Sequence, residues 1–270
     1  MEVSNDNLLR LNGTSLYAIK EGQGEAVVFM HGFGLDHRMW KRQMDVLRSS
    51  YTVINYDLRG FGESALPDQQ TPYTHEDDYL ALIHHFGFQR AHIIASSMGG
   101  RMALRCALTC QHAVSSLLVL DSIIDGYVWS VSWLLEWSNI VSAAKDNALD
   151  VARDLWMQHS LFVHANSDPV IAAELETMIG KYSGWHWIYK DPALVPQPPA
   201  INRLEQIAVP TLVMAGEHDI PDFREAANKL YHNIPNAQWF IVPGSGHMVN
   251  MESPDIVNDA ILNFLGNISA

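Results

Sequence analysis

The stretch AHIIASSMGGRMALRCAL, residues 91–108, changes from one pattern to another within a single residue. Residues 91–96 form an apolar run, which predicts a buried strand. Residues 98–108 carry helix-forming side chains with a period of about 3.6, which predicts a helix. Ser97 must therefore make the whole strand-to-helix turn, and we expect it in a strained backbone conformation with positive φ.

The size of the neighbours of Ser97 supports this turn. The turn brings two stretches of backbone so close together that the residues two before and two after its centre must be small, as Ala95 and Gly99 are. A turn centred on Ser96 would need a small residue in place of Met98, which rules that register out. The pattern resembles the nucleophile elbow of the α/β-hydrolase superfamily, G-x-S-x-G, with alanine in place of the first glycine. An ordinary strand–turn–helix with a serine cap is the alternative that this stretch leaves open.

Composition narrows the class of protein. The chain has 270 residues, 48% hydrophobic and 17% charged, which suits one α/β domain with an insertion. A formal net charge of −13 disfavours nucleic acid and anionic membrane surfaces as partners, so we expect a small-molecule partner. Residues 1–7 lack the basic start and apolar core of a secretory signal, which predicts a cytoplasmic protein. The histidines show no zinc-type spacing, so we expect no metal, and the oligomeric state is not indicated.

Apolar runs and helical segments alternate along most of the chain. This order predicts a mostly parallel sheet flanked by helices, whose ligands bind at the carboxyl ends of the strands. Together with the resemblance, it predicts the α/β-hydrolase fold with an inserted helical cap. The expected strands are residues 26–30, 51–56, 91–96, 114–120, 207–215 and 238–242.

The alternation stops near residue 123 and resumes near residue 201. We therefore expect a core in two parts, residues 1–122 and 201–270, with a helical cap at residues 123–200. The first cap helix is expected at residues 130–140. Most cap tryptophans should pack the cap onto the core, and others should line an apolar pocket. The pocket candidates are Trp129, Trp133, Trp185, Trp187 and Met248.

Two segments near the first strands carry loop motifs. The segment DLRGFGES, residues 57–64, lacks the spacing of a nucleotide-binding loop and resembles a superfamily turn in which the Asp and Arg are structural. The segment HGFG, residues 31–34, follows an expected strand. In the superfamily, the residue after His-Gly and the residue after the nucleophile donate backbone N–H groups to an oxyanion hole, which here implies Phe33 and Met98. Taken alone, residues 31–34 fit an ordinary βα loop equally well.

The resemblance also implies an acid and a base. Asp219 follows an expected strand at the position of the superfamily's triad acid, and Asp121, after the preceding strand, is the reserve. His247 lies in a glycine-flanked loop after the last strand. The order Ser97, Asp219, His247 matches the order of the superfamily. It implies a serine hydrolase that needs no cofactor, in which His247 accepts the serine proton and an acyl-serine forms.

The substrate is less well indicated. Residues 34–40, residues 56–64 and the Ser-Met-Gly-Gly stretch look like the branch of 3-oxoadipate enol-lactonases and small carboxylesterases. An anionic lactone would need a basic anchor. Within residues 123–200, carboxylates outnumber the basic residues, which are Lys145, Arg153, Lys181 and Lys190. We therefore favour a neutral, fairly apolar ester or lactone.

Two other functions remain open on the same fold. Hydrolases that cleave carbon–carbon bonds of dienoic diketones also carry Ser-Met-Gly-Gly, but they usually have a longer Gly-Pro-Gly-type oxyanion loop, which this chain lacks. Small-molecule receptors and signalling proteins of this fold often keep an intact triad. A serine at the elbow disfavours the alkyl-enzyme route of dehalogenases and epoxide hydrolases, which use an aspartate.

Overall fold

The computed structural model describes residues 7–268. Residues 1–6, which carry most of the stretch used to predict that no secretory signal is present, lie outside the described residues. None of the helices in the described part of the chain has the length and apolar character needed to span a bilayer.

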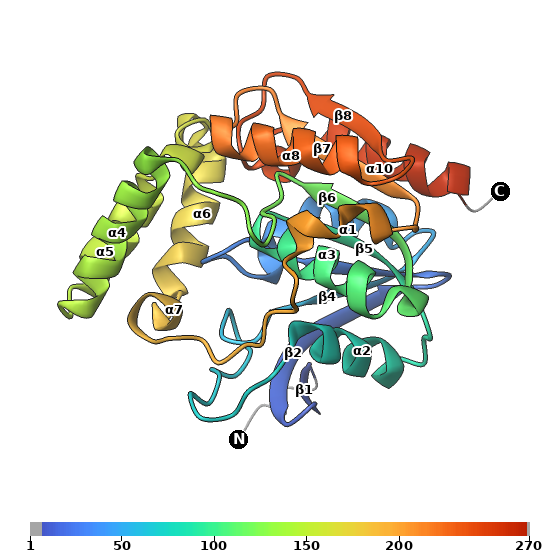
Figure 1. Cartoon of the computed structure of the whole chain (residues 1–270), viewed down its shortest axis with the longest axis horizontal. Coiled ribbons are helices and arrows are strands. Elements are labelled where there is room, and N and C mark those ends of the chain that lie inside the picture. Colours follow the sequence, from blue (N-terminus) through green and yellow to red (C-terminus); the bar gives the residue numbers. More distant parts are fainter. Residues whose placement is uncertain (1–6, 269–270) are drawn as a thin grey trace.

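One eight-stranded sheet forms the centre of the molecule (Figure 1). Its strand order is β1-β2-β4-β3-β5-β6-β7-β8; β2 pairs antiparallel with β1 and β4, and the remaining neighbours are parallel. The predicted mostly parallel α/β architecture is confirmed. The strands are β1 (Leu8–Leu11), β2 (Thr14–Gly22), β3 (Ala26–Met30), β4 (Thr52–Tyr56), β5 (Ala91–Ser96), β6 (Val114–Leu120), β7 (Thr211–Gly216) and β8 (Gln238–Val242).

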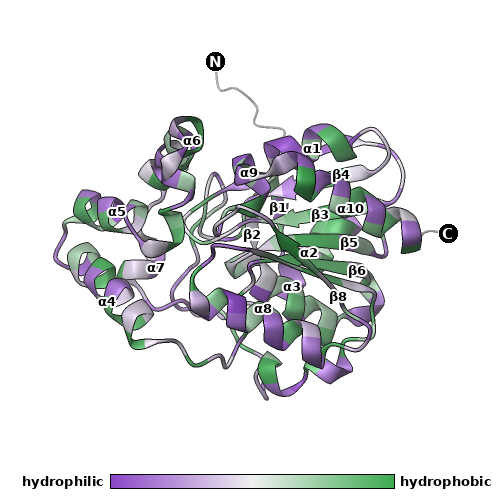
Figure 2. Cartoon of the chain, turned by 90° about the horizontal axis from the view of Figure 1, so that it is seen from above, coloured by the Kyte–Doolittle hydropathy of each residue, from purple (hydrophilic) through white to green (hydrophobic). Residues whose placement is uncertain are grey.

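Helices cover both faces of the sheet. Every residue of β3, β4, β5 and β7 is buried, as expected for parallel strands with helices on both sides. Figure 2 shows α1 and α10 on one side of these apolar strands and α3 and α8 on the other. The helices next to the sheet are α1 (Lys41–Leu47), α2 (His75–His85), α3 (Met98–Thr109), α8 (Pro221–Asn233), α9 (Val249–Glu252) and α10 (Pro254–Ile268).

Residues 123–200, which we call the cap segment, hold four α-helices between β6 and β7. Figure 1 shows them beside the sheet, where α5 packs against α4 and α6, and α7 packs against α4. They are α4 (Val131–Lys145), α5 (Leu149–Met157), α6 (Pro169–Lys181) and α7 (Trp185–Ile188). The expectation that this segment is a separate cap domain stays a prediction.

Some bounds differ from those predicted. Helix α4 continues to Lys145, well past residue 140. Strand β7 begins at Thr211, because residues 204–206 form a turn of 3-10 helix and Pro210 has no N–H for a sheet ladder. Helices α7 and α9 have four residues each, too few to show a helical period in the sequence.

A close approach between α3 and β3 fixes the helix that follows Ser97. A Cβ atom on Gly99 would collide with the backbone carbonyl oxygens of Met30 and His31 at the end of β3. These atoms belong to backbone and do not swing aside as a flexible side chain does. Gly99 therefore sets how near α3 lies to the sheet.

We expect Gly99→Ala to lower the free energy of unfolding by about 1–3 kcal/mol, the usual cost of overpacking. Gly180→Ala is the matched control, because a Cβ on Gly180 in α6 meets nothing within 4 Å. That variant should gain up to about 1 kcal/mol from better helix propensity. Urea unfolding followed by circular dichroism measures both, and equal stabilities of the two variants would contradict the steric argument.

Candidate active site

Ser97 makes the turn between β5 and α3. Its φ is 53° and its ψ is −115°, so the predicted positive φ is confirmed. The N–H of Ser97 donates to the carbonyl of Leu120 over 2.9 Å, and its own carbonyl accepts from Ile123 over 3.2 Å and from Arg101 over 3.3 Å. The strained residue is thus held by β6 on one side and by its own helix on the other.

His247 and Asp219 form a buried pair. The Nδ1 atom of His247 donates to Oδ2 of Asp219 over 2.9 Å, and the two residues are 3% and 5% exposed. The other carboxylate oxygen of Asp219 accepts from the N–H of Ile220 over 2.7 Å. The ring of Phe223 meets the imidazole edge to face, with centroids 4.3 Å apart. With Nδ1 bound to the carboxylate, Nε2 is the imidazole atom available to a substrate or a serine.

Backbone packing brings the loops of this pair together. A Cβ atom on Gly216, at the end of β7, would collide with the carbonyl oxygens of Ser245 and Gly246. The N–H of His218 donates to the carbonyl of Ser245 over 2.8 Å. The loops after β7 and β8 therefore pack main chain to main chain, which places Asp219 beside His247.

Glu252 holds the histidine loop and gave no signal in the sequence. Its carboxylate accepts from the N–H groups of Gly246 over 2.6 Å and Met248 over 3.0 Å, the two residues that flank His247. The same carboxylate accepts from Nδ1 of His164 in the cap segment over 2.7 Å. No sequence motif marks a glutamate five positions after a histidine, so only the fold identifies this contact.

Asp121, the reserve acid, lies next to the pair. Its side chain and those of Asp219 and His247 offer ligand atoms within 4.8 Å of one another. Oδ1 of Asp121 accepts from the N–H of Gly216 over 2.9 Å. Burial first, and then the charge of Asp219, raise the pKa of Asp121 well above its usual range. Asp121 therefore keeps its proton, and Asp219 is the carboxylate that pairs with the imidazole.

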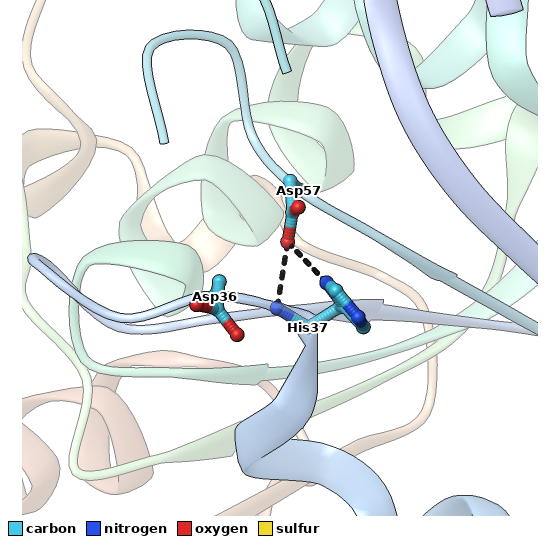
Figure 3. A group of neighbouring side chains, drawn as sticks. All are labelled: Asp36, His37 and Asp57. Atoms are coloured by element: carbon cyan, nitrogen blue, oxygen red, sulfur yellow. Dashed lines mark hydrogen bonds and ion pairs between the residues drawn. The ribbon is translucent and has the colours of Figure 1, made fainter. Parts of the chain in front are cut away.

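A second cluster of acidic and histidine side chains lies at the loops after β3 and β4 (Figure 3). Asp57 accepts from the N–H and Nδ1 of His37 through Oδ1, and from the N–H of Glu63 through Oδ2. Both oxygens of Asp36 accept from Arg38. Every carboxylate oxygen in the cluster is thus already engaged by the chain, so we assign the cluster a structural role.

Ser97 faces two adjoining hollows. The larger is a cavity of about 310 Å³, and the smaller is a crevice of about 10 Å³ that Ser97 shares with His247 and Met248. Aromatic side chains dominate the larger cavity. Its lining residues are Phe33, Ser97, Met98, Arg101, Ile123, Trp129, Trp133, Leu134, Trp137, Trp156 and Leu161.

The tryptophans expected at a pocket divide into two groups. Trp129 and Trp133 line the larger cavity, with centroids 4.5 Å apart in a stacked pair. Trp185 and Trp187, in contrast, are not among its lining residues. Trp187 is 1% exposed and packs edge to face against Tyr182, because α7 turns it into the cap segment. Trp137 and Trp156, which were not pocket candidates, take these places in the lining.

The candidate oxyanion amides lie on either side of the serine. A Cβ atom on Gly32 would lie 3.6 Å from the Cβ of Ser97, so the loop that carries Phe33 passes beside the elbow. Met98 is the first residue of α3, where an N–H has no acceptor within its own helix. Among the described residues, neither the N–H of Phe33 nor that of Met98 donates a hydrogen bond. Both amides are free to bind a negative oxygen.

Known proteins resemble this chain along most of its length. The alpha/beta hydrolase family matches residues 27–260. 3-Oxoadipate enol-lactonase 1 of Acinetobacter baylyi is 26% identical over 234 residues, which cover 85% of this chain and 84% of that protein. The 2-hydroxy-6-oxo-6-(2'-aminophenyl)hexa-2,4-dienoic acid hydrolase of Metapseudomonas resinovorans is 25% identical, covering 96% and 90%. The structure of a thermophilic esterase from Thermogutta terrifontis superposes with a TM-score of 0.81 and 25% identity, covering 98% of each chain.

Two substitutions separate the neighbouring carboxyl groups. Asp219→Asn should lower kcat for ester hydrolysis by roughly 1,000-fold or more, because the imidazole loses the charge that orients and stabilises it. Asp121→Asn should leave kcat within about 3-fold, because an amide imitates the neutral acid. The opposite ranking would assign the acid to Asp121.

Stability against pH gives an independent check on Asp121. A raised pKa in the folded protein stabilises it below the unfolded pKa of about 3.9, and this contribution is lost as the pH rises. The Asp121→Asn variant has no carboxyl group at this position, so it does not lose stability in this way as the pH rises. Its melting temperature should exceed that of the wild type by a margin that grows from about pH 5 to about pH 8. A margin independent of pH would show that Asp121 ionises normally.

Proposed function

The chain belongs to the alpha/beta hydrolase family, and from this premise we propose that it is a serine hydrolase of a small, fairly apolar carboxylic ester or lactone. The observation that carries the proposal is the crevice that Ser97 shares with His247. Nδ1 of His247 is hydrogen-bonded to Asp219, which leaves Nε2 for the serine. Its relatives include an enol-lactonase and an esterase, which supports hydrolysis of an ester or lactone, and they also include a dienoic acid hydrolase.

The proposed reaction has two acyl transfers. Oγ of Ser97 attacks the substrate carbonyl carbon while Nε2 of His247 takes the hydroxyl proton, and Asp219 stabilises the imidazolium. The carbon–oxygen bond then breaks, and the departing alcohol or enol oxygen receives that proton. Water next attacks the acyl-serine, giving one proton to His247. Collapse releases the carboxylic acid and returns the proton to the serine.

The backbone favours the charged intermediate. As the carbonyl becomes tetrahedral, its oxygen gains a negative charge that the N–H groups of Phe33 and Met98 would bind. Removing one preorganised donor of this kind from another enzyme raised the activation barrier by roughly 3–4 kcal/mol. Met98 also lies at the positive end of the α3 dipole, which favours an anion there.

The aromatic lining of the larger cavity favours an apolar acyl chain on the substrate. Four tryptophans and Phe33 line it, and a flat aromatic wall gains most from burying a hydrocarbon. The ring of Phe33 also meets Trp137, Trp156 and Tyr182 of the cap segment edge to face. We therefore include in the proposal that residues 123–200 act as a cap that shields the acyl-serine from bulk water.

Labelling with a fluorophosphonate tests the nucleophile directly. Intact mass should show one adduct on the wild type, and turnover of p-nitrophenyl butyrate should accompany it. Both should vanish in Ser97→Ala, because the only activated hydroxyl is lost. The matched control is Ser96→Ala, one residue earlier in β5, which should keep the adduct and turnover within about 3-fold of the wild type, as its hydroxyl is not the activated group.

Three results would redirect the proposal. A folded wild type that takes no adduct would contradict an activated serine and favour a receptor role. An adduct that persists in Ser97→Ala would move the nucleophile elsewhere. Turnover of a dienoic 1,5-diketone, followed by the loss of its absorbance, without ester turnover would point to carbon–carbon cleavage, the reaction named for the Metapseudomonas relative.

A further inference from the structure

A positively charged side chain lines the aromatic cavity beside Ser97. Among the described residues that line it, Arg101 is the only one with a charged side chain. It lies one turn after the serine on α3, and its backbone N–H donates to the carbonyl of Ser97 over 3.3 Å. The proposed nucleophile and this guanidinium therefore share one cavity.

The guanidinium has no hydrogen-bond acceptor within the described part of the chain. Its Nε is buried, yet its side chain as a whole is 33% exposed. Because Arg101 also lines the cavity, we attribute this exposure to the cavity. Arginine carries five N–H donors and does not lose its proton in proteins. A partly buried cation whose Nε meets no acceptor is stabilised when a group of opposite charge reaches it.

The nearby carboxylates are committed to other groups. Asp125 lies 3.9 Å from Nε of Arg101, but both of its oxygens accept from Arg105, over 2.6 Å and 2.9 Å. Asp191, the next acidic neighbour, accepts from the hydroxyl of Tyr73 over 3.2 Å and from the backbone of Ala193 over 3.0 Å. Two guanidinium groups thus share the carboxylate of Asp125.

The neighbouring histidines add no positive charge to the cavity region. Burial first, and then the charge of Arg101, lower the pKa of His186 to about 3. Burial, followed by the charges of Arg105 and Arg101, lowers the pKa of His75 well below its usual range. Both rings are neutral at physiological pH, so they neither add to the charge nor cancel it.

We infer that Arg101 binds a carboxylate at the far end of the substrate's acyl chain. The substrate is then an ester or lactone of a small dicarboxylic acid, with a hydrocarbon middle against the tryptophans and a free carboxylate on the guanidinium. A planar guanidinium matches a carboxylate through two parallel hydrogen bonds. Ser97 and Arg101 lie one helical turn apart along α3 and line the same cavity, so one small ligand can reach both side chains. This inference rests on the proposed serine hydrolase function.

It also revises the charge expected from the sequence. The basic residues counted there belong to the cap segment, and none of them lines the cavity. Arg153 instead donates to the carbonyl of Tyr182, and Lys181 lines a separate pocket near Asp36. The cation is supplied by a core helix, which the count over residues 123–200 did not include.

Matched substrates test the inference. The mono-p-nitrophenyl esters of glutaric, adipic and pimelic acid carry the free carboxylate, and their methyl-capped counterparts do not. Arg101→Gln should lower kcat/KM for the best anionic ester roughly 10- to 100-fold, the value of a charge-assisted pair, and for its capped counterpart less than about 3-fold. Arg101→Lys should restore part of the loss. Lys190→Gln, which removes one exposed cation elsewhere, should match the wild type.

Equal losses on the anionic and capped esters would overturn the inference, because a structural role for Arg101 changes both alike. If Arg101→Gln does not fold, the wild type still decides. Adipate, and not dimethyl adipate, should protect Ser97 from the fluorophosphonate, and no protection would overturn the inference. If no ester is hydrolysed and no adduct forms, the serine hydrolase proposal fails. Calorimetric titration of adipate then tests Arg101 by itself, and absence of binding would overturn its assignment.

Discussion

The rest of the structure depends on the contact between Gly99 and the carbonyl groups that end β3. Without that contact, α3 would stand farther from the sheet, and Ser97 could not turn from strand to helix within one residue. The same contact brings the start of α3 beside the end of β3, which leads into the loop of Phe33. One steric constraint thus sets the positions of the proposed nucleophile, of both candidate oxyanion amides and of Arg101 one turn later.

Burial makes the charges at this edge of the sheet unequal. Asp121 and Asp219 lie together where water is excluded, so one keeps its proton and the other pairs with His247. The side chain of Glu252 is 4% exposed and accepts three hydrogen bonds, which hold the histidine loop and reach His164 in the cap segment. In this part of the molecule, carboxyl groups of the same type differ in role because their donors differ.

One part of the cavity surface favours the apolar portion of a ligand, and another part favours an anionic group. Its tryptophans favour hydrocarbon, whereas the guanidinium of Arg101 favours an anion, and the carboxylate of Asp125 beside it is already hydrogen-bonded to Arg105. An amphipathic substrate satisfies both, and its orientation would be set by the cation and not by the shape of the aromatic wall. The aromatic contacts of Phe33 connect this wall to the loop beside the serine.

The sequence by itself determined the alternation of strands and helices, the mostly parallel sheet and the positive φ of Ser97, because these follow from local periodicity and from the size of adjacent residues. Tertiary structure decided which carboxyl group meets His247 and which tryptophans face the serine. It also decided that Arg101 lines the cavity and shares the carboxylate of Asp125 with Arg105. These outcomes depend on how helices and loops far apart in the chain pack together, and a side chain's neighbours across that packing leave no periodic signal in the sequence.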